Sequence, residues 1–573
     1  MLTDFAARRK NRIIFIAVFA SIVWLLHRRA QQSNSPIVPP TYRAPLEFKP
    51  ANFDWSSAKQ YFPVDSLTPL PRGKPKKLPL VQHQFGKAHE DDAISKKRRE
   101  TVRKAFIRSW KSYKDHAWLH DELLPVTGGF KDPFGGWAAT LVDCLDTLWI
   151  MDLKDEFYEA AAIAVQLDWS NTTESGINLF ETTIRHLGGL IAAYDLSKEP
   201  TLLIKAVELG DMLYMAFDTP NRTPGFWLTF EDAKAGRQVA GTNDPSSGPT
   251  SLSLEFTRLS QLTGDDKYYD AIDRIRQLLE RTQEQSRLPG MWPIMFNFRE
   301  GTVLGDNSFS LGALADSLYE YLPKMAVLLG GRKGSASYEK MYRRAMDVVI
   351  QHVLFRPMLP GKEDFLFAGT TFVHEDGIHP NPEMQHLTCF VGGMFALGGK
   401  IFGIDEHIDI GDRLARGCGW VYQSFPTGVM PEIYGLIECP SLEPCNWDNE
   451  KWQREGDQSL TRGFRHARDP RYLLRPEAIE SIFIMYRVKG EEDLRETAWN
   501  MFEGIMKSTQ TPLANSAIKN VTVNGETEKE DSMESFWMAE TLKYFYLIFS
   551  SPDTISLDEY VLNTEAHPFG RFD

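Results

Sequence analysis

The chain has 573 residues and a mass of 65.3 kDa, which is enough to bury a large core. Hydrophobic residues make up 42% and charged residues 25%, so a largely disordered or collagen-like chain is excluded. The formal charge of −13 is uneven, because residues 1–104 contain 20 Lys and Arg against 8 Asp and Glu, and the remainder contains 44 against 69. Because phosphate binding needs a positive surface, the acidic body argues against nucleic-acid binding and suits a cation or a neutral polar ligand.

The first predicted element is an apolar run at residues 13–26, flanked by basic residues on both sides. Its fourteen residues would span about 21 Å as a helix, against about 30 Å for a hydrocarbon core. No small-residue cleavage site follows it, as a signal peptide requires, and a core helix is disfavoured so close to a basic terminus. We therefore expect a short signal anchor, with residues 1–12 in the cytosol and the body in the lumen of the Golgi or endoplasmic reticulum. The chain would be a single-pass type II membrane protein.

A proline-rich segment at residues 27–96 follows the anchor. It contains ten prolines between residues 31 and 80 and little periodic apolar pattern, which predicts an extended stem. A helical pattern begins near residue 97, so residues 97–573 are predicted to form the folded body.

The cysteines and glycosylation sequons bear on the lumenal assignment. The five cysteines fit no zinc or CxxC pattern, and an oxidising lumen would allow up to two disulfides and one free thiol. Cys144 lies in an apolar helical run and is the expected buried thiol, whereas spacing alone leaves open whether Cys439 and Cys445 pair. Weak support for the lumen comes from N-x-[ST] sequons at Asn171, Asn221 and Asn520.

The body repeats one pattern, in which an apolar helix rich in Gly and Ala is followed by a short turn and an amphipathic helix. Clear examples are residues 179–217, 251–283 and 475–506. The apolar helix of each pair should be buried and the amphipathic helix should face solvent. The units are irregularly spaced and mostly more than 50 residues apart, unlike solenoid repeats. We expect an all-α fold in which helical hairpins close into a ring, with a plain helical array as the alternative.

Polar residues recur near the starts of the buried helices, as a shared central cavity would require. They are Glu181 with Arg185, Glu255, Asp316, Glu432, Arg475 with Glu477 and Glu480, Phe536 with Glu540, and Thr564 with Glu565. Singly, each carboxylate is explained by a helix cap or dipole, and a Glu–Arg pair four residues apart by a salt bridge. Together, the negative charges of these carboxylates need nearby positive charge, because a buried charge is costly unless it is paired or metal-bound. Such an oxygen-rich cavity suits calcium, and paired carboxylates without a Cys or His cluster indicate glycoside hydrolysis.

Several segments, in order over most of the body, carry a resemblance to one family. They include GGWAATLVDCLDTLWIM, FETTIRHLGGL, SLSLEF, DSLYEYL, HLTCFVGGM, LRPEAIES, ESFWMAETLKYFYLIF and VLNTEAHP. From about Arg98 to the end, the chain resembles the class I α-1,2-mannosidases of glycoside hydrolase family 47. The resemblance implies an (α/α)7 barrel, calcium dependence, and inverting removal of terminal α-1,2-linked mannose from oligomannose N-glycans. We expect the protein to act as a monomer.

The resemblance also implies roles for individual residues. Glu181 corresponds to the acid that protonates the leaving oxygen, directly or through a water, and Glu477 to the base that activates the attacking water. Asp316 corresponds to a third essential carboxylate, and Glu432 to another proposed acid. Thr564 would give calcium its hydroxyl and carbonyl oxygens. The cation's waters or the sugar would be held by Glu255, Glu480, Glu540 and Glu565. The mannose subsite would be lined by Arg185, His386, Arg475 and Phe536. The family disulfide would join Cys389 and Cys418.

Three positions depart from the family pattern. Leu314 stands where members of the endoplasmic-reticulum type carry an arginine, which resembles Golgi-type members that trim several mannoses. Pro323 replaces a leucine and is expected to break or kink the helix that begins near Asp316. Leu119 and His120 depart from a glycine-containing pattern, without a consequence that we can derive.

Two other functions compete with the mannosidase. A non-hydrolytic lectin of glycoprotein quality control would keep the fold and the calcium, but the intact acid and base candidates argue against it. A different α/α-toroid hydrolase, such as a glucosidase, would not explain the NTEAHP segment with its calcium-binding threonine.

Overall fold

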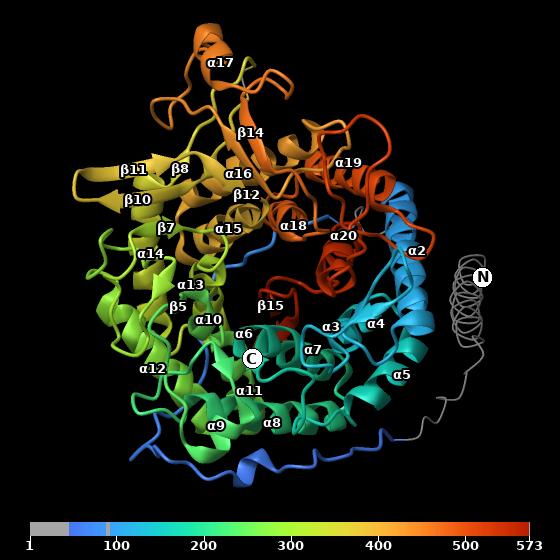
Figure 1. The fold of residues 1–573 in the computed structure, drawn as a ribbon, viewed down its shortest axis with the longest axis vertical. Coiled ribbons are helices and arrows are strands. Elements are labelled where there is room, and N and C mark those ends of the chain that lie inside the picture. Colours follow the sequence, from blue (N-terminus) through green and yellow to red (C-terminus); the bar gives the residue numbers. More distant parts are fainter. Residues whose placement is uncertain (1–44, 87–91, 362, 572–573) are drawn as a thin grey trace, which may run out of the picture. The chain divides into compact units, whose positions relative to one another are not determined.

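Helical hairpins arranged in a ring form the body of the chain in this computed structural model, which describes residues 45–86, 92–361 and 363–571. Residues 47–573 form one compact unit (Figure 1). The predicted anchor at residues 13–26 and the tail before it lie outside the described residues. Within the described part of the chain, no helix combines the length and the hydrophobicity needed to cross a bilayer.

Inner and outer helices alternate around the ring (Figure 1). The inner helices are α7 (Gly188–Ser197), α11 (Ser253–Thr263), α13 (Asp316–Leu328), α15 (Phe390–Phe402), α18 (Glu477–Lys489) and α20 (Leu542–Ile548). The outer helices are α2 (Ala93–His116), α5 (Lys154–Ala164), α8 (Pro200–Tyr214), α12 (Asp266–Thr282), α14 (Ser335–His352), α16 (Asp405–Gln423) and α19 (Glu492–Thr509). Shorter helices are α3 (Ala139–Asp143), α4 (Leu145–Ile150), α6 (Leu179–Glu181), α9 (Phe230–Ala235), α10 (Ser247–Thr250) and α17 (Asn449–Glu455). Of these, α4 takes the seventh inner position, where it packs against α7 and the outer helix α5.

The burial of each hairpin agrees with the sequence pattern. Inner helix α15 buries 11 of its 13 residues, whereas its outer partner α16 buries 10 of 19. The two helices approach closely because both carry glycines where they meet, and a Cβ on Gly411 would lie 2.6 Å from the Gly392 carbonyl oxygen. The predicted ring of helical hairpins is therefore confirmed, and it fits an (α/α)7 barrel.

Short antiparallel strands, which the sequence did not predict, connect the hairpins. Two three-stranded sheets have the orders β11–β10–β7 and β12–β13–β14. Their strands are β7 (Ser308–Ser310), β10 (Thr370–His374), β11 (Gly377–Asn381), β12 (Glu383–Gln385), β13 (Ile433–Leu436) and β14 (Phe464–Asp469). Two-stranded pairs are β1 (Glu122–Leu123) with β2 (Phe130–Lys131), β3 (Ile177–Asn178) with β4 (Trp227–Leu228), β5 (Asp244–Pro245) with β6 (Met295–Phe296), β8 (Leu354–Phe355) with β9 (Phe367–Ala368), and β15 (Tyr560–Leu562) with β16 (Pro568–Gly570). Most are too short for a period-two pattern to stand out. The β15–β16 hairpin lies inside the ring (Figure 1).

The cysteines pair as far as their number allows. Cys389 is bonded to Cys418 with a Cα–Cα distance of 6.0 Å, which confirms the expected disulfide and joins the residue before α15 to α16. Cys439 is bonded to Cys445, which the sequence left open. Cys144 is the buried free thiol, as expected.

Pro323 does not break its helix, so the expected break was wrong, whereas the alternative of a kink stays a prediction. α13 continues from Asp316 to Leu328 with Pro323 inside it. The proline cannot donate to the carbonyl of Tyr319, but the residues on both sides of it are buried, and their packing holds the helix together.

Residues 47–86, here called the strap, are not a free stem. Apart from the 3₁₀ turn η1 (Trp55–Ser57) they lack helices and strands, as expected, yet Trp55 and Val81 are each only 2% exposed. The predicted boundary at residue 97 was therefore wrong, because the compact unit begins at Glu47 and α2 begins at Ala93. Prolines prevented a helical or strand pattern, but they did not prevent the extended chain from packing on the barrel.

Candidate active site

The carboxylates predicted at the helix starts meet in one cavity of about 300 Å³. Its lining comes from the starts of α6, α13 and α18, from the π-helical segments η3 (Thr182–Leu187) and η6 (Trp537–Thr541), and from the turn between β15 and β16. Ten of the thirteen predicted catalytic, metal and sugar-binding residues line it, and Glu255, His386 and Glu432 do not. The carboxylates in the lining are Glu181, Asp316, Glu320, Glu477, Glu480, Glu534, Glu540 and Glu565.

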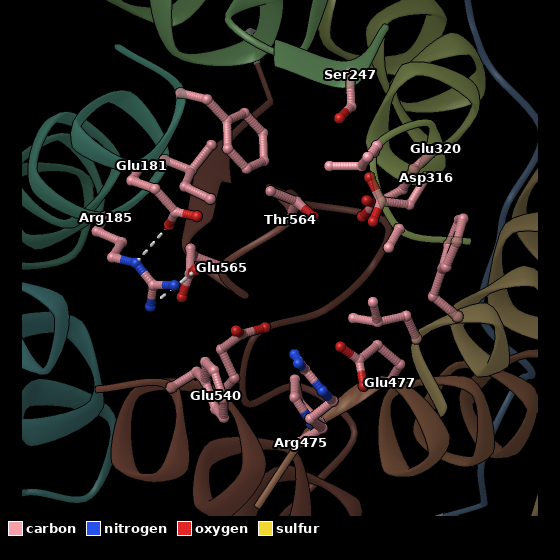
Figure 2. A pocket seen from close by; sticks show the side chains of 18 of the residues that line it. Glu181, Arg185, Ser247, Asp316, Glu320, Arg475, Glu477, Glu540, Thr564 and Glu565 are labelled. Atoms are coloured by element: carbon pink, nitrogen blue, oxygen red, sulfur yellow. Dashed lines mark hydrogen bonds and ion pairs between the residues drawn. The ribbon is translucent and has the colours of Figure 1, made fainter. Parts of the chain in front are cut away.

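Glu181 and Arg185 form one side of the cavity (Figure 2). The Asn178 side chain caps the short helix that carries Glu181, since its Oδ1 accepts the Glu181 N–H at 3.1 Å. Arg185, one helical turn later, donates from Nε to Glu181 Oε2 at 2.8 Å and pairs through Nη1 with Glu565 Oε1 at 3.1 Å. The pair is therefore both a salt bridge and part of the cavity lining.

Glu477 begins α18 on the opposite side of the cavity (Figure 2). His386 hydrogen-bonds Glu477 Oε2 through Nδ1 at 2.8 Å and the Tyr422 hydroxyl through Nε2 at 2.8 Å. Burial alone would raise the pKa of Glu477, but the hydrogen bond from His386 and the charges of His386 and Arg475 outweigh it and lower that pKa. His386 thus acts behind the cavity, through Glu477.

Glu432 also lies behind the lining. Its Oε2 accepts from Arg475 Nε at 2.6 Å and its Oε1 from the Leu473 N–H at 3.2 Å, so it fixes Arg475. Arg475 in turn lies 5.7 Å from the centre of the Phe536 ring, and Arg185 lies at the same distance from it. Two predicted sugar-binding arginines and the predicted stacking ring are therefore brought together.

Asp316, the first residue of α13, lies half-buried at the wall of the cavity. It accepts the Ser317 N–H at 2.8 Å, and no ion pair joins it to a basic side chain within the residues that the structure describes. Burial, reinforced by the charges of Glu320 and Glu477, raises the pKa of Asp316 to about 7. Asp316 and Glu477 therefore differ in protonation near neutral pH.

The turn between β15 and β16 presents Thr564 to the cavity. The Tyr321 hydroxyl accepts the Thr564 N–H at 3.2 Å and donates to Glu255 Oε1 at 2.8 Å, an oxygen that also accepts from Asn563 at 2.8 Å. Glu255 Oε2 and Glu565 Oε2 are buried and have no hydrogen-bond partner among the residues that the structure describes. Burial raises the pKa of Glu255 to about 7 and that of Glu565 to about 8.

This turn fits a hydrated cation rather than a cage of carboxylates. Among the described residues, no group of three or more His, Cys, Asp or Glu side chains is placed to coordinate one metal ion directly. Thr564 nevertheless offers hydroxyl and carbonyl oxygens, and the two free carboxylate oxygens of Glu255 and Glu565 can accept from water. Calcium prefers such oxygen ligands and commonly keeps waters.

Several lining residues were not predicted from the sequence. Glu320 lies one turn after Asp316 on the same helix, a spacing that could have identified it. Glu534, Ser247 and the aromatic residues Phe180 and Phe226 carried no comparable signal. Leu314, singled out as a departure, lines the cavity, is 45% exposed and has a φ of 76°.

Comparisons with known proteins identify the family of this chain. Residues 105–571 match glycosyl hydrolase family 47. The chain is 35% identical over 489 residues to the endoplasmic reticulum mannosyl-oligosaccharide 1,2-alpha-mannosidase of Rattus norvegicus, covering 84% of this chain and 69% of the relative. It is 34% identical over 510 residues to the probable mannosyl-oligosaccharide alpha-1,2-mannosidase 1B of Aspergillus flavus, covering 86% and 95%. The solved structure of alpha-1,2-mannosidase from Trichoderma reesei superposes with a TM-score of 0.75 at 31% identity, covering 83% and 99%.

Proposed function

Because the chain belongs to glycosyl hydrolase family 47, we propose that it removes terminal α-1,2-linked mannose from oligomannose N-glycans, with inversion and with calcium as cofactor. The observation that carries this proposal is the carboxylate-lined cavity, in which the pKa of Glu477 is lowered and that of Asp316 is raised. A glycosidase needs two carboxyl groups in opposite protonation states.

Glu477 is the proposed base. Its carboxylate stays ionised at neutral pH and can take a proton from the attacking water, while His386 and Arg475 stabilise its charge. The hydrogen bond from His386 also fixes the orientation of the carboxylate, so that one oxygen remains directed at the cavity.

The proposed acid has two candidates. The resemblance assigns the role to Glu181, which could protonate the leaving oxygen through a water. Asp316 is favoured by its own environment, since a pKa of about 7 lets it hold a proton near neutral pH. The pH profiles described in the Discussion decide between them.

Arg185, Arg475 and Phe536 form the proposed mannose subsite. An aromatic ring with the hydrogen-bond donors of two arginines close to it suits a pyranose ring, which is apolar on its faces and polar around its rim. The ion pairs of both arginines hold these donors in place before the sugar binds.

Thr564 is the proposed calcium ligand. Glu255 and Glu565 would accept hydrogen bonds from the cation's waters with their free oxygens, and Glu480 and Glu540 lie in the same lining. When bound, calcium supplies a fixed positive charge that can hold sugar hydroxyls.

We also propose that residues 13–26 anchor the chain with the compact unit in the lumen of the Golgi or endoplasmic reticulum. Two disulfides support an oxidising compartment. We further propose that the chain acts as a monomer.

The test is to incubate the detergent-solubilised full chain with a nine-mannose oligosaccharide, with calcium or with EDTA, and to follow the released sugar by proton NMR. Calcium-dependent release of β-mannose is expected. Release of α-mannose would contradict inversion, and full activity in EDTA would contradict the cofactor. Calcium-dependent glycan binding without any release would support the lectin instead.

A further inference from the structure

The strap is attached to the barrel by hydrogen bonds from its backbone to acidic side chains. Seven of its N–H groups donate to carboxylates at 2.6–3.0 Å, which are charge-assisted bonds. In chain order they join Ala51 to Glu208, Asn52 to Asp168, Tyr61 and Phe62 to Asp218, Thr68 to Asp270, Leu70 to Asp266, and Val81 to Asp558. The strap precedes residues 105–571, which match the family, so the family match does not account for it.

The C-terminal part of the strap is bound to the far end of α18, the helix that Glu477 begins. Arg487 is fully buried there and donates to Gln82 Oε1 at 2.7 Å and to the Pro552 carbonyl at 2.5 Å. The His83 N–H donates to the Arg487 carbonyl at 2.6 Å. These bonds hold the strap across the end of the barrel, and Val81 with it.

Val81 closes a second, much smaller cavity of about 20 Å³. Aliphatic side chains of α13, α15 and α18 surround it, together with Lys324 and Tyr544. The volume admits about one water, but a buried water needs two to four polar partners, and this lining is mostly apolar. The cavity is therefore expected to be dry.

Lys324 lies between the two cavities. It lines the small one, and its Nζ is 2.5 Å from Glu320 Oε1 and 3.8 Å from Glu480 Oε1, two carboxylates that line the catalytic cavity. Burial lowers the pKa of Lys324, but the charges of Glu320 and Glu480 outweigh this and raise it. Such pairs weaken when water reaches them, because the effective dielectric constant rises.

We propose that Val81 is a positioning residue of the active site: it seals the barrel beneath Lys324, and Lys324 in that dry setting holds Glu320 and Glu480 in the floor of the catalytic cavity. This inference rests on the proposed function. It gives the strap a role in catalysis in addition to its contribution to stability.

A double-mutant cycle in the full chain tests the proposal. Val81→Thr keeps the size of the side chain but adds a hydroxyl that can bring water into the small cavity. We expect Val81→Thr to lower kcat/KM about fivefold and Lys324→Met about 100-fold, with no further loss when the two are combined, because both act through one group. Leu70→Thr is the matched control, since Leu70 lies in the same strap but does not line this cavity. It should lower the melting temperature and leave kcat/KM unchanged.

The proposal is overturned if the kcat/KM of the double variant Val81→Thr, Lys324→Met falls by the product of the two single-variant losses. It is also overturned by a Leu70→Thr variant that loses as much kcat/KM as Val81→Thr, since the strap would then act only through stability. If Val81→Thr fails to fold, Val81→Ala opens the same cavity. If the wild type releases no mannose, the proposed function fails. The same double-mutant cycle is then measured by the rise in melting temperature when calcium is added. If the double variant loses the sum of the two single-variant reductions in this rise, the link between Val81 and Lys324 is refuted.

Discussion

The two sides of the catalytic cavity carry similar carboxylates but compensate their charges differently. On one side, Arg185 pairs with both Glu181 and Glu565. On the other side, Glu477 has cationic partners, whereas Asp316 is joined to none among the described residues (Figure 2). The pKa values of Glu477 and Asp316 therefore move in opposite directions, which shows that the partners of a buried carboxyl, more than its depth, determine its protonation.

The Arg185 side is supported from behind by a second set of buried charges. The ring nitrogens of His567 lie 3.0 Å from Asp143 Oδ1 and 2.9 Å from Asp146 Oδ2, and Lys543 is 2.7 Å from Asp146. The Ser535 hydroxyl donates to Asp143 and accepts from Arg185, which links this set to the cavity. The Asp316 side has no comparable support for Asp316 itself.

The largest expected effect is the loss of the ionised carboxylate. Glu477→Gln should lower kcat about 10³-fold with little change in KM, because a general base acts in the transition state rather than in substrate binding. Steady-state kinetics on the nine-mannose oligosaccharide measure this. Glu432→Gln is the control, since Glu432 touches Arg475 but does not line the cavity. An equal kcat loss in Glu432→Gln would contradict the placement of Glu432 behind the site.

The second prediction identifies the acid. An acid must be protonated to work, so with Asp316 in that role activity should fall as the pH rises above about 7. Asp316→Asn should lower kcat/KM about 10²-fold or more and abolish this alkaline limb in a pH profile. If the limb remains in Asp316→Asn and disappears in Glu181→Gln, the acid is Glu181.

The placement of these residues was largely predictable from the sequence. Glu181, Asp316 and Glu477 each stand at the start of an apolar helix, and inner helices that begin at one end of a ring must bring such residues together. Which of these carboxylates has a cationic partner was not predictable from the sequence. That Glu477 pairs with His386 while Asp316 has no cation depends on contacts between distant segments, which no local pattern encodes.

The packing of the strap and the continuity of the helix around Pro323 also could not be predicted from local sequence patterns. A proline-rich segment has no helical or strand period, so the sequence could not distinguish a free stem from a chain packed on the barrel. The break expected at Pro323 followed from local sterics, whereas the burial of the surrounding helix is a property of the whole barrel.

The third prediction concerns stability on the Arg185 side. Burial alone would lower the pKa of His567, but Asp146 and Asp143 raise it to about 9. Because the folded pKa lies above the ordinary value of about 6.5, the stabilisation is fully present below pH 6.5 and is lost as the pH rises through about 9. It amounts to about 3 kcal/mol at neutral pH.

His567→Gln should therefore melt well below the wild type at pH 6, and the difference should narrow at pH 10. The control is His407→Gln, since His407 is also buried but its pKa is lowered to about 4, chiefly by burial. Its melting difference should change in the opposite direction and widen slightly at pH 10, because at pH 6 the unfolded His407 binds protons that the folded one does not. A difference for His567→Gln that fails to narrow at pH 10 would mean that His567 is not a cation in the folded protein.

The smallest expected effect lies at the rim of the Asp316 side. Leu314 reaches the cavity two residues before Asp316, and its carbonyl accepts the Ser247 N–H at 3.0 Å. We expect the wild type to trim the nine-mannose substrate to five mannoses, and Leu314→Arg to accumulate the eight-mannose product while its first cleavage slows less than about threefold. Leu304→Arg, at an exposed leucine outside the lining, should leave the product pattern unchanged. A Leu314→Arg variant that loses the first cleavage altogether would mean that the rim controls entry of every branch rather than selection among them.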